Sequence, residues 1–130
     1  MHALIIEDQP LIAEIIGVEL AQLGYTSFDV VDREEDAVAA AQSRCPDLIT
    51  ADDRLVSGTG IAAVEKICAD RAIPVLFIVG DVSGLRRTFP GADTLEKPFT
   101  IAALHDKVTS MAPCGGFGRS RAKLAHPASR

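Results

Sequence analysis

The chain has 130 residues, which is enough for one domain with a hydrophobic core and too few for two. Its composition, 48% hydrophobic and 24% charged, is ordinary for a globular domain. The formal net charge of -5 argues against nonspecific nucleic-acid binding, and no apolar run approaches the roughly 20 residues of a membrane helix. We therefore expect one globular domain that binds neither nucleic acid nor membrane.

Two kinds of apolar pattern alternate five times along the chain. Short aliphatic runs predict strands, and apolar residues at helical spacing predict the segments between them. The fourth helical segment lies between the fourth and fifth strand-like runs. Gly84 and Pro90 interrupt it, which predicts a short or irregular helix there. Strands are expected at residues 3–6, 26–31, 47–51, 74–79 and 92–96, and the other helices at 10–23, 32–42, 61–68 and 100–111.

This alternation predicts an α/β domain with a parallel sheet, right-handed crossovers and helices on both faces. Asp32, with Glu35 three residues later, resembles a capping box, and Thr100 is a typical N-cap for the last helix.

The charge is unevenly distributed between a long acidic part and a short basic one. Residues 1–112 carry 9 basic and 18 acidic groups, whereas residues 113–130 carry four basic groups and no acidic one. The second segment contains three glycines and shows no amphipathic period. We expect a folded domain at 1–112 and a flexible basic tail at 113–130.

The cysteines and the N-terminus bear on the compartment. Cys45, Cys68 and Cys114 are odd in number and lack a metal-binding spacing, and the first strand begins without a secretory signal before it. We expect free thiols in a reducing compartment and therefore a cytoplasmic protein.

Three of the predicted strands end in charged residues. The first strand is followed by Glu7 and Asp8, the third by Asp52, and the fifth by Lys97. In an open α/β sheet the binding crevice lies at the carboxyl ends of the strands, so these groups are expected to converge. Two carboxylates 4 Å apart repel each other by about 4 kcal/mol at an effective dielectric constant near 20, so the cluster calls for a cation.

The chemistry of these groups indicates a phosphoryl site. Carboxylate oxygens suit Mg²⁺, which often bridges to a phosphate. Lys97 supplies a positive charge for a phosphoryl oxygen, and an aspartate beside a metal can act as a nucleophile. The candidate nucleophiles are Asp52 and its neighbour Asp53.

Residues 1 to about 112 resemble a CheY-like receiver domain of two-component response regulators. The resemblance rests on three stretches, Leu4–Leu11, Pro46–Gly60 and Glu96–Phe99. It implies a flavodoxin-like fold with sheet order 2-1-3-4-5. It also implies a cis peptide bond between Lys97 and Pro98 and the absence of classical enzyme activity beyond autophosphorylation and autodephosphorylation.

The resemblance assigns roles to individual residues. Its register favours Asp52 over Asp53 as the phosphoacceptor. Asp8, Asp52 and the backbone carbonyl of Arg54 would bind Mg²⁺, with Glu7 acting through a bound water. Lys97 would contact the phosphoryl group.

Two positions depart from the family pattern. Val79 stands where receivers usually carry the Ser or Thr that hydrogen-bonds the phosphoryl group, and Thr94 stands where many carry a Tyr or Phe that switches rotamer. Because a hydrogen bond to a charged group contributes about 1.5–3 kcal/mol, we expect weakened coupling between phosphorylation and conformational change.

The leading prediction is a stand-alone response regulator. It would accept a phosphoryl group from a histidine kinase or phosphotransfer protein and signal to an unknown target through the fourth helix, fifth strand and last helix. The alternative is a pseudo-receiver that binds partners without phosphorylation. A metal-dependent phosphatase is a distant third, since Glu7-Asp8-Gln9 lacks the D-x-D spacing.

Overall fold

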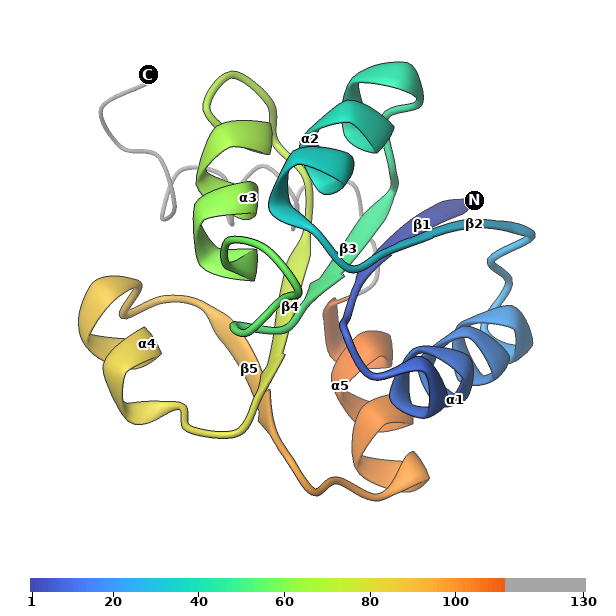
Figure 1. Cartoon of the computed structure of the whole chain (residues 1–130). Coiled ribbons are helices and arrows are strands. Elements are labelled where there is room, and N and C mark those ends of the chain that lie inside the picture. Colours follow the sequence, from blue (N-terminus) through green and yellow to red (C-terminus); the bar gives the residue numbers. More distant parts are fainter. Residues whose placement is uncertain (112–130) are drawn as a thin grey trace.

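A computed structural model describes residues 1–111 and shows a central parallel sheet covered by helices on both faces (Figure 1). The strand order is β2-β1-β3-β4-β5, so the predicted order 2-1-3-4-5 is confirmed. The predicted tail, with Cys114, lies outside the described residues. The strands are β1 (His2–Ile6), β2 (Ser27–Val31), β3 (Leu48–Ala51), β4 (Val75–Val79) and β5 (Asp93–Glu96), and the helices are α1 (Pro10–Gln22), α2 (Glu34–Ser43), α3 (Gly60–Ile67), α4 (Ser83–Thr88) and α5 (Ile101–Met111).

Each face of the sheet has its own apolar core. Helices α1 and α5 lie on one face of the sheet and helices α2, α3 and α4 on the other (Figure 1), and the buried side chains form one cluster on each face. Residues of the central strands alternate between the two cores, so that Ile5 and Ile6 of β1 lie in different clusters and are both almost fully buried. Burial on both faces explains why these strands read as continuous apolar runs.

The fourth helix is short, as predicted. It spans six residues, from Ser83 to Thr88, and only Leu85 of this helix is buried. Its C-terminal neighbour Phe89 stacks on Phe77 of β4 with ring centroids 5.8 Å apart. A small helix is thus held on the sheet by a few apolar contacts.

One predicted helix cap is confirmed and another is wrong. The hydroxyl of Thr100 accepts a hydrogen bond from the N–H of Ala103 at 3.0 Å. Asp32 does not cap α2, since that helix begins at Glu34 and its N-cap position is Arg33, without a side-chain cap bond. The carbonyl of Asp32 instead accepts the N–H of Val56 at 2.9 Å. A contact with a distant loop therefore takes precedence over the local capping pattern.

Two further observations concern the cysteines and the lengths of the helices. Cys45 and Cys68 are free thiols, and burial raises the pKa of Cys68 to about 11. Among the helices within residues 1–111, none has the length and apolar character needed to span a bilayer.

Candidate functional site

The charged residues that follow β1, β3 and β5 meet at one edge of the sheet. Because β1 pairs with β3 in parallel register, Ile6 lies opposite Ala51, and the acidic residues after them are neighbours. Carboxylate oxygens of Glu7, Asp8 and Asp52 all lie within 4.8 Å of one another. Glu7 and Asp52 are buried, at 3% and 6% exposure, while Asp8 is partly exposed.

Lys97 bridges the two buried carboxylates. Its ammonium group donates to Glu7 Oε2 at 3.1 Å and to Asp52 Oδ2 at 3.0 Å. Burial alone would lower the pKa of Lys97, but the hydrogen bonds to Asp52 and Glu7 outweigh it and raise the pKa. The peptide bond to Pro98 is cis, as predicted, and the N–H of Lys97 donates to the carbonyl of Val79 at 2.8 Å. Lys97 therefore fastens the end of β5 to the end of β4 and points its charge at the acidic cluster.

One oxygen of the cluster is left without a partner in the described part of the chain. Glu7 Oε2 accepts hydrogen bonds from Lys97 and from the N–H of Gln9, whereas Glu7 Oε1 is buried and has none. Burial foremost, and then the negative charge of Asp52, raises the pKa of Glu7 from 4.5 to about 7. An unsatisfied buried carboxylate oxygen beside two further carboxylates fits a hydrated Mg²⁺ ion, which binds oxygen ligands and keeps several waters.

The raised pKa of Glu7 predicts a pH dependence of stability in the metal-free protein. Between pH 4.5 and about 7 the folded state holds more protons on Glu7 than the unfolded state does, so stability from this group is present below pH 4.5 and is lost as the pH rises through about 7. The loss is on the order of 3 kcal/mol, since one pKa unit corresponds to about 1.4 kcal/mol.

Urea unfolding in a chelator measures this dependence. We expect Glu7→Gln to become more stable relative to wild type as the pH is raised from 5.5 to 8. Glu35→Gln is the matched control, because Glu35 is exposed on the first turn of α2. A constant difference between wild type and Glu7→Gln would contradict the prediction.

The structure separates Asp52 from its neighbours in the following loop. Asp53 is exposed and is not part of the three-carboxylate cluster, and its N–H donates to Asp52 Oδ1 at 2.7 Å. Arg54 follows in the loop and forms an isolated antiparallel bridge with Thr59. Asp52 is thus the aspartate that faces Lys97, and the backbone of this loop runs beside the cluster.

Val79 occupies the end of β4 next to the site and is only 1% exposed. It belongs to the core cluster that contains Val82 and Leu85, the residues that hold α4 on the sheet. The next residue, Gly80, borders open space, since an added Cβ would meet no described atom within 4 Å. Thr94 is partly buried and lies opposite Phe77 in the β4–β5 register. The positions of the usual relay groups therefore hold an aliphatic core residue and a small side chain.

Val79→Thr is expected to restore a response to a phosphoryl mimic. A buried hydroxyl without a partner costs about 1–3 kcal/mol, so the unliganded variant should be less stable than wild type. Beryllofluoride with Mg²⁺ should stabilise it more than it stabilises wild type, because the hydroxyl then gains a charged acceptor.

Thermal unfolding with and without the mimic gives this difference. Val79→Ala serves as the control that loses packing without gaining a hydroxyl. Equal stabilisation of wild type and Val79→Thr would mean that the missing hydroxyl does not limit coupling.

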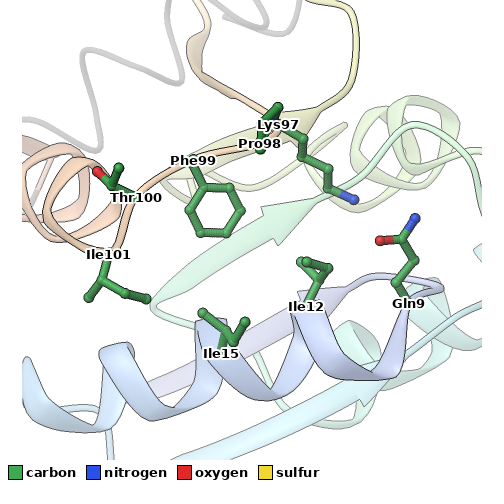
Figure 2. Close-up of a pocket in the computed structure, with 8 residues that line it drawn as sticks. All are labelled: Gln9, Ile12, Ile15, Lys97, Pro98, Phe99, Thr100 and Ile101. Carbon is green, nitrogen blue, oxygen red and sulfur yellow. The ribbon is translucent and has the colours of Figure 1, made fainter.

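An apolar groove of about 640 Å³ opens beside the site between α1 and the start of α5. In Figure 2, Ile12 and Ile15 of α1 face Phe99 and Ile101 across the groove, with Lys97 and Gln9 at one end. Ile101 in the groove wall is 51% exposed, and Leu11, which precedes Ile12 in α1, is 68% exposed. The groove therefore leads from an exposed apolar surface to the lysine of the acidic cluster.

Two features of the site were not predicted from the sequence. The groove joins residues about 85 positions apart, which no local pattern reveals. Glu34 accepts a hydrogen bond from the N–H of Thr59, in the loop after Asp52. A signal for the second contact was present, since two glycines within three residues, Gly58 and Gly60, indicate close approach of the backbone to another group.

The fold and the acidic edge define the class of protein. A five-stranded parallel sheet in the order 2-1-3-4-5, with carboxylates and a lysine at its carboxyl edge, is a flavodoxin-like arrangement of the kind found in CheY-like domains. Residues 3–109 match the response regulator receiver domain family. The chain belongs to this family.

Similar proteins come from several bacteria. The chain is 39% identical over 77 residues to the phyllosphere-induced regulator PhyR of Methylorubrum extorquens, covering 58% of this chain and 29% of that protein. It is 30% identical over 115 residues to the DNA-binding dual master transcriptional regulator RpaA of Synechocystis, covering 83% and 47%. The chain spans less than half the length of these curated relatives.

One similar solved structure contains a metal ion. The receiver domain of the sensor histidine kinase PA1611 from Pseudomonas aeruginosa matches with a TM-score of 0.71 and 26% identity, covering 84% of this chain and 94% of that one. That structure has a magnesium ion coordinated in its active-site cleft.

Proposed function

We propose that this receiver domain accepts a phosphoryl group on Asp52 from a histidine kinase or a phosphotransfer protein, with Mg²⁺ bound by Asp8, Asp52 and the backbone carbonyl of Arg54. Glu7 would act on the ion through a water. The observation that carries the proposal is the contact of Lys97 with both Glu7 and Asp52 at about 3 Å, at the edge of the sheet where the carboxylates gather.

The residues divide the chemistry between them. A carboxylate oxygen of Asp52 forms a bond to phosphorus while the bond from phosphorus to the donor nitrogen breaks, and the electron pair of that bond stays on the nitrogen. The ammonium group of Lys97 exchanges its hydrogen bond with a carboxylate oxygen for one with a phosphoryl oxygen. Both oxygens are negatively charged, so the lysine keeps an acceptor of the same kind. Mg²⁺ supplies neutralisation of the negative charge on the carboxylates and the incoming group. We also propose that Asp52 undergoes autophosphorylation and autodephosphorylation. The proposed location of the protein is the cytoplasm.

Beryllofluoride and Mg²⁺, followed by NMR, test phosphoacceptance. We expect Mg²⁺-dependent shifts of the amides near Asp8 and Asp52 in wild type and a further change with beryllofluoride. Asp52→Ala should lose the beryllofluoride response altogether. Wild-type spectra that do not respond to the mimic would overturn the proposal.

The groove between α1 and α5 is the proposed binding site for the phosphoryl donor protein. It is apolar and ends at Lys97, so a partner lying in it reaches the acidic cluster. Ile101→Asp should slow transfer from a donor protein roughly tenfold or more, while phosphorylation by a small molecule such as acetyl phosphate stays unchanged.

Val30→Asp is the matched control for this experiment. Val30 is 56% exposed and lies on β2, at the opposite edge of the sheet from β5. Equal loss of transfer from both donors in Ile101→Asp would place the effect in the acidic site and contradict docking in the groove.

The second candidate function is a pseudo-receiver that binds a partner whatever the state of Asp52. The observation that favours it is Val79, which lies in the core where a relay hydroxyl would stand. The proposed contact face for a downstream target is α4, β5 and α5. Unchanged affinity of Asp52→Ala for a captured partner, measured with and without beryllofluoride, would favour the pseudo-receiver, whereas a mimic-dependent affinity in wild type would exclude it.

A further inference from the structure

The N-terminus of α2 is fastened to the loop that follows Asp52. Glu34 is the first residue of α2, and its side chain is 18% exposed. Its Oε1 accepts the N–H of Thr59 at 3.1 Å, and its Oε2 accepts the ammonium group of Lys66 at 2.6 Å. Its own N–H donates to the carbonyl of Ser57 at 2.9 Å. One residue therefore joins α2, the loop and α3.

The backbone at Gly58 leaves room for the side chain of Glu34. Its φ is +79°, a conformation that side chains rarely adopt, and an added Cβ would lie 2.3 Å from Glu34 Oε1 and 2.5 Å from Glu34 Cβ. The loop can pass beneath the carboxylate only because this residue has no side chain. Hydrogen bonding and steric fit thus define the same contact.

At the other end of the loop, Gly60 lies against the backbone of Asp52 and Asp53. The N–H of Gly60 donates to the carbonyl of Asp53 at 3.0 Å, and a Cβ on Gly60 would lie 1.7 Å from the carbonyl oxygen of Asp52. Between these ends, Thr59 bridges to Arg54 and caps α3 by accepting the N–H of Ala62 at 3.1 Å. Only a few bonds separate Glu34 from the backbone of the proposed metal ligands.

From these contacts we infer that Glu34 is a positioning residue, which holds the loop of residues 53–59 in the form that presents the Arg54 carbonyl to Mg²⁺. The inference rests on the proposed function for the role of Arg54. Lys66 supports Glu34 by keeping its carboxylate charged and directed at the loop, since the hydrogen bond from Lys66 foremost, and then that from Thr59, lowers the pKa of Glu34. Glu34 itself is not one of the three carboxylates that cluster at the site.

Two substitutions of Glu34 divide its contacts. Glu34→Ala removes both side-chain hydrogen bonds, from Thr59 and from Lys66, whereas Glu34→Gln keeps an acceptor for Thr59 and loses the charge and the acceptor toward Lys66. Glu35→Ala and Glu35→Gln are matched controls, because Glu35 is the exposed neighbour on the same helical turn. The readouts are hydrogen exchange of the Thr59 amide in metal-free protein and Mg²⁺ affinity by NMR titration.

We expect Thr59 to exchange about tenfold faster in Glu34→Ala. Mg²⁺ should bind roughly tenfold more weakly in that variant, the lower end of what outer partners of metal ligands contribute. Glu34→Gln should restore most of both quantities, and the Glu35 variants should match wild type.

The outcomes separate the inference from the proposed function. Faster exchange of Thr59 with unchanged Mg²⁺ affinity would overturn the positioning role while leaving phosphoacceptance intact. Failure of wild type to bind Mg²⁺ would overturn the proposed function and the positioning role together, whatever the exchange rates.

Gly58→Ala tests the steric part of the same contact. It should lower stability more in wild type than in Glu34→Ala, because the carboxylate oxygen that would lie 2.3 Å from the added Cβ is gone there, whereas the contact with the Cβ of residue 34 and the strain of a positive φ remain in both. Additive effects of the two substitutions would show that the carboxylate of Glu34 does not lie against the loop and would overturn the inference.

Discussion

Replacing Gly60 by alanine is expected to lower the free energy of unfolding by about 3 kcal/mol, the upper end of the usual range for overpacked interiors. The added Cβ would lie 1.7 Å from the carbonyl oxygen of Asp52 and 2.9 Å from its carbonyl carbon. Both atoms belong to the backbone, so no side-chain rotation can relieve the contact. Either α3 must move away from β3 or the backbone at Asp52 must shift, and the second change would also displace the acidic cluster.

Gly80→Ala is the matched control for this substitution. Gly80 follows β4 beside the same site, and an added Cβ there would meet no described atom within 4 Å. Its effect on stability should stay within about 0.5 kcal/mol, as for most surface substitutions. Urea unfolding of both variants measures the difference. Equal stability of the two alanine variants would mean that α3 does not press on the carbonyl of Asp52.

The sheet could be predicted from the sequence because its strands are buried on both faces. Ala3 to Ile6 is wholly apolar since each of these four side chains enters one core or the other. A run of this kind between helical patterns leaves few alternatives to a parallel sheet. The convergence of Glu7, Asp52 and Lys97 then follows from topology, because parallel strands bring their carboxyl ends to one edge.

Contacts between distant segments were beyond the reach of sequence patterns. Asp32 has the spacing of a capping box, yet the N-terminus of α2 is instead fastened to the loop at Val56 and Ser57. Glu34 and Thr59 are 25 residues apart, and no periodicity links them. Local sequence patterns predict hydrogen bonds between residues up to four positions apart. Which backbone N–H groups at a helix end still need a side-chain acceptor depends on how distant loops pack against that end, and the sequence does not show this packing.

The role of Val79 shows a second limit of the sequence. The absence of a hydroxyl was evident from the residue type, but the environment of the side chain was not. The structure places Val79 in the core with Val82 and Leu85, so its methyl groups help to hold α4 on the sheet. The residue that stands in place of the expected relay hydroxyl thus also contributes apolar packing between β4 and α4.

Lys97→Met is expected to destabilise the metal-free protein by about 3 kcal/mol at pH 8, the usual cost of removing one member of a buried ionic pair. The ammonium group of Lys97 contacts Glu7 and Asp52, whose side chains are 1% and 8% exposed. Without it, two buried carboxylates face each other with no countercharge among their described neighbours. Mg²⁺ should restore much of the lost stability, because the ion replaces the missing positive charge.

Two further variants make this expectation specific to the acidic cluster. Lys107→Met should cost less than about 1 kcal/mol, since Lys107 is 35% exposed and lies 3.9 Å from Asp93. Asp52→Asn in the Lys97→Met background should recover stability without Mg²⁺, because it removes one of the two repelling charges. Chemical unfolding in a chelator and in Mg²⁺ measures both. If Lys97→Met lost as little as Lys107→Met and gained nothing from Mg²⁺, the carboxylates would not be held together by Lys97, and the contact that carries the proposed function would be absent.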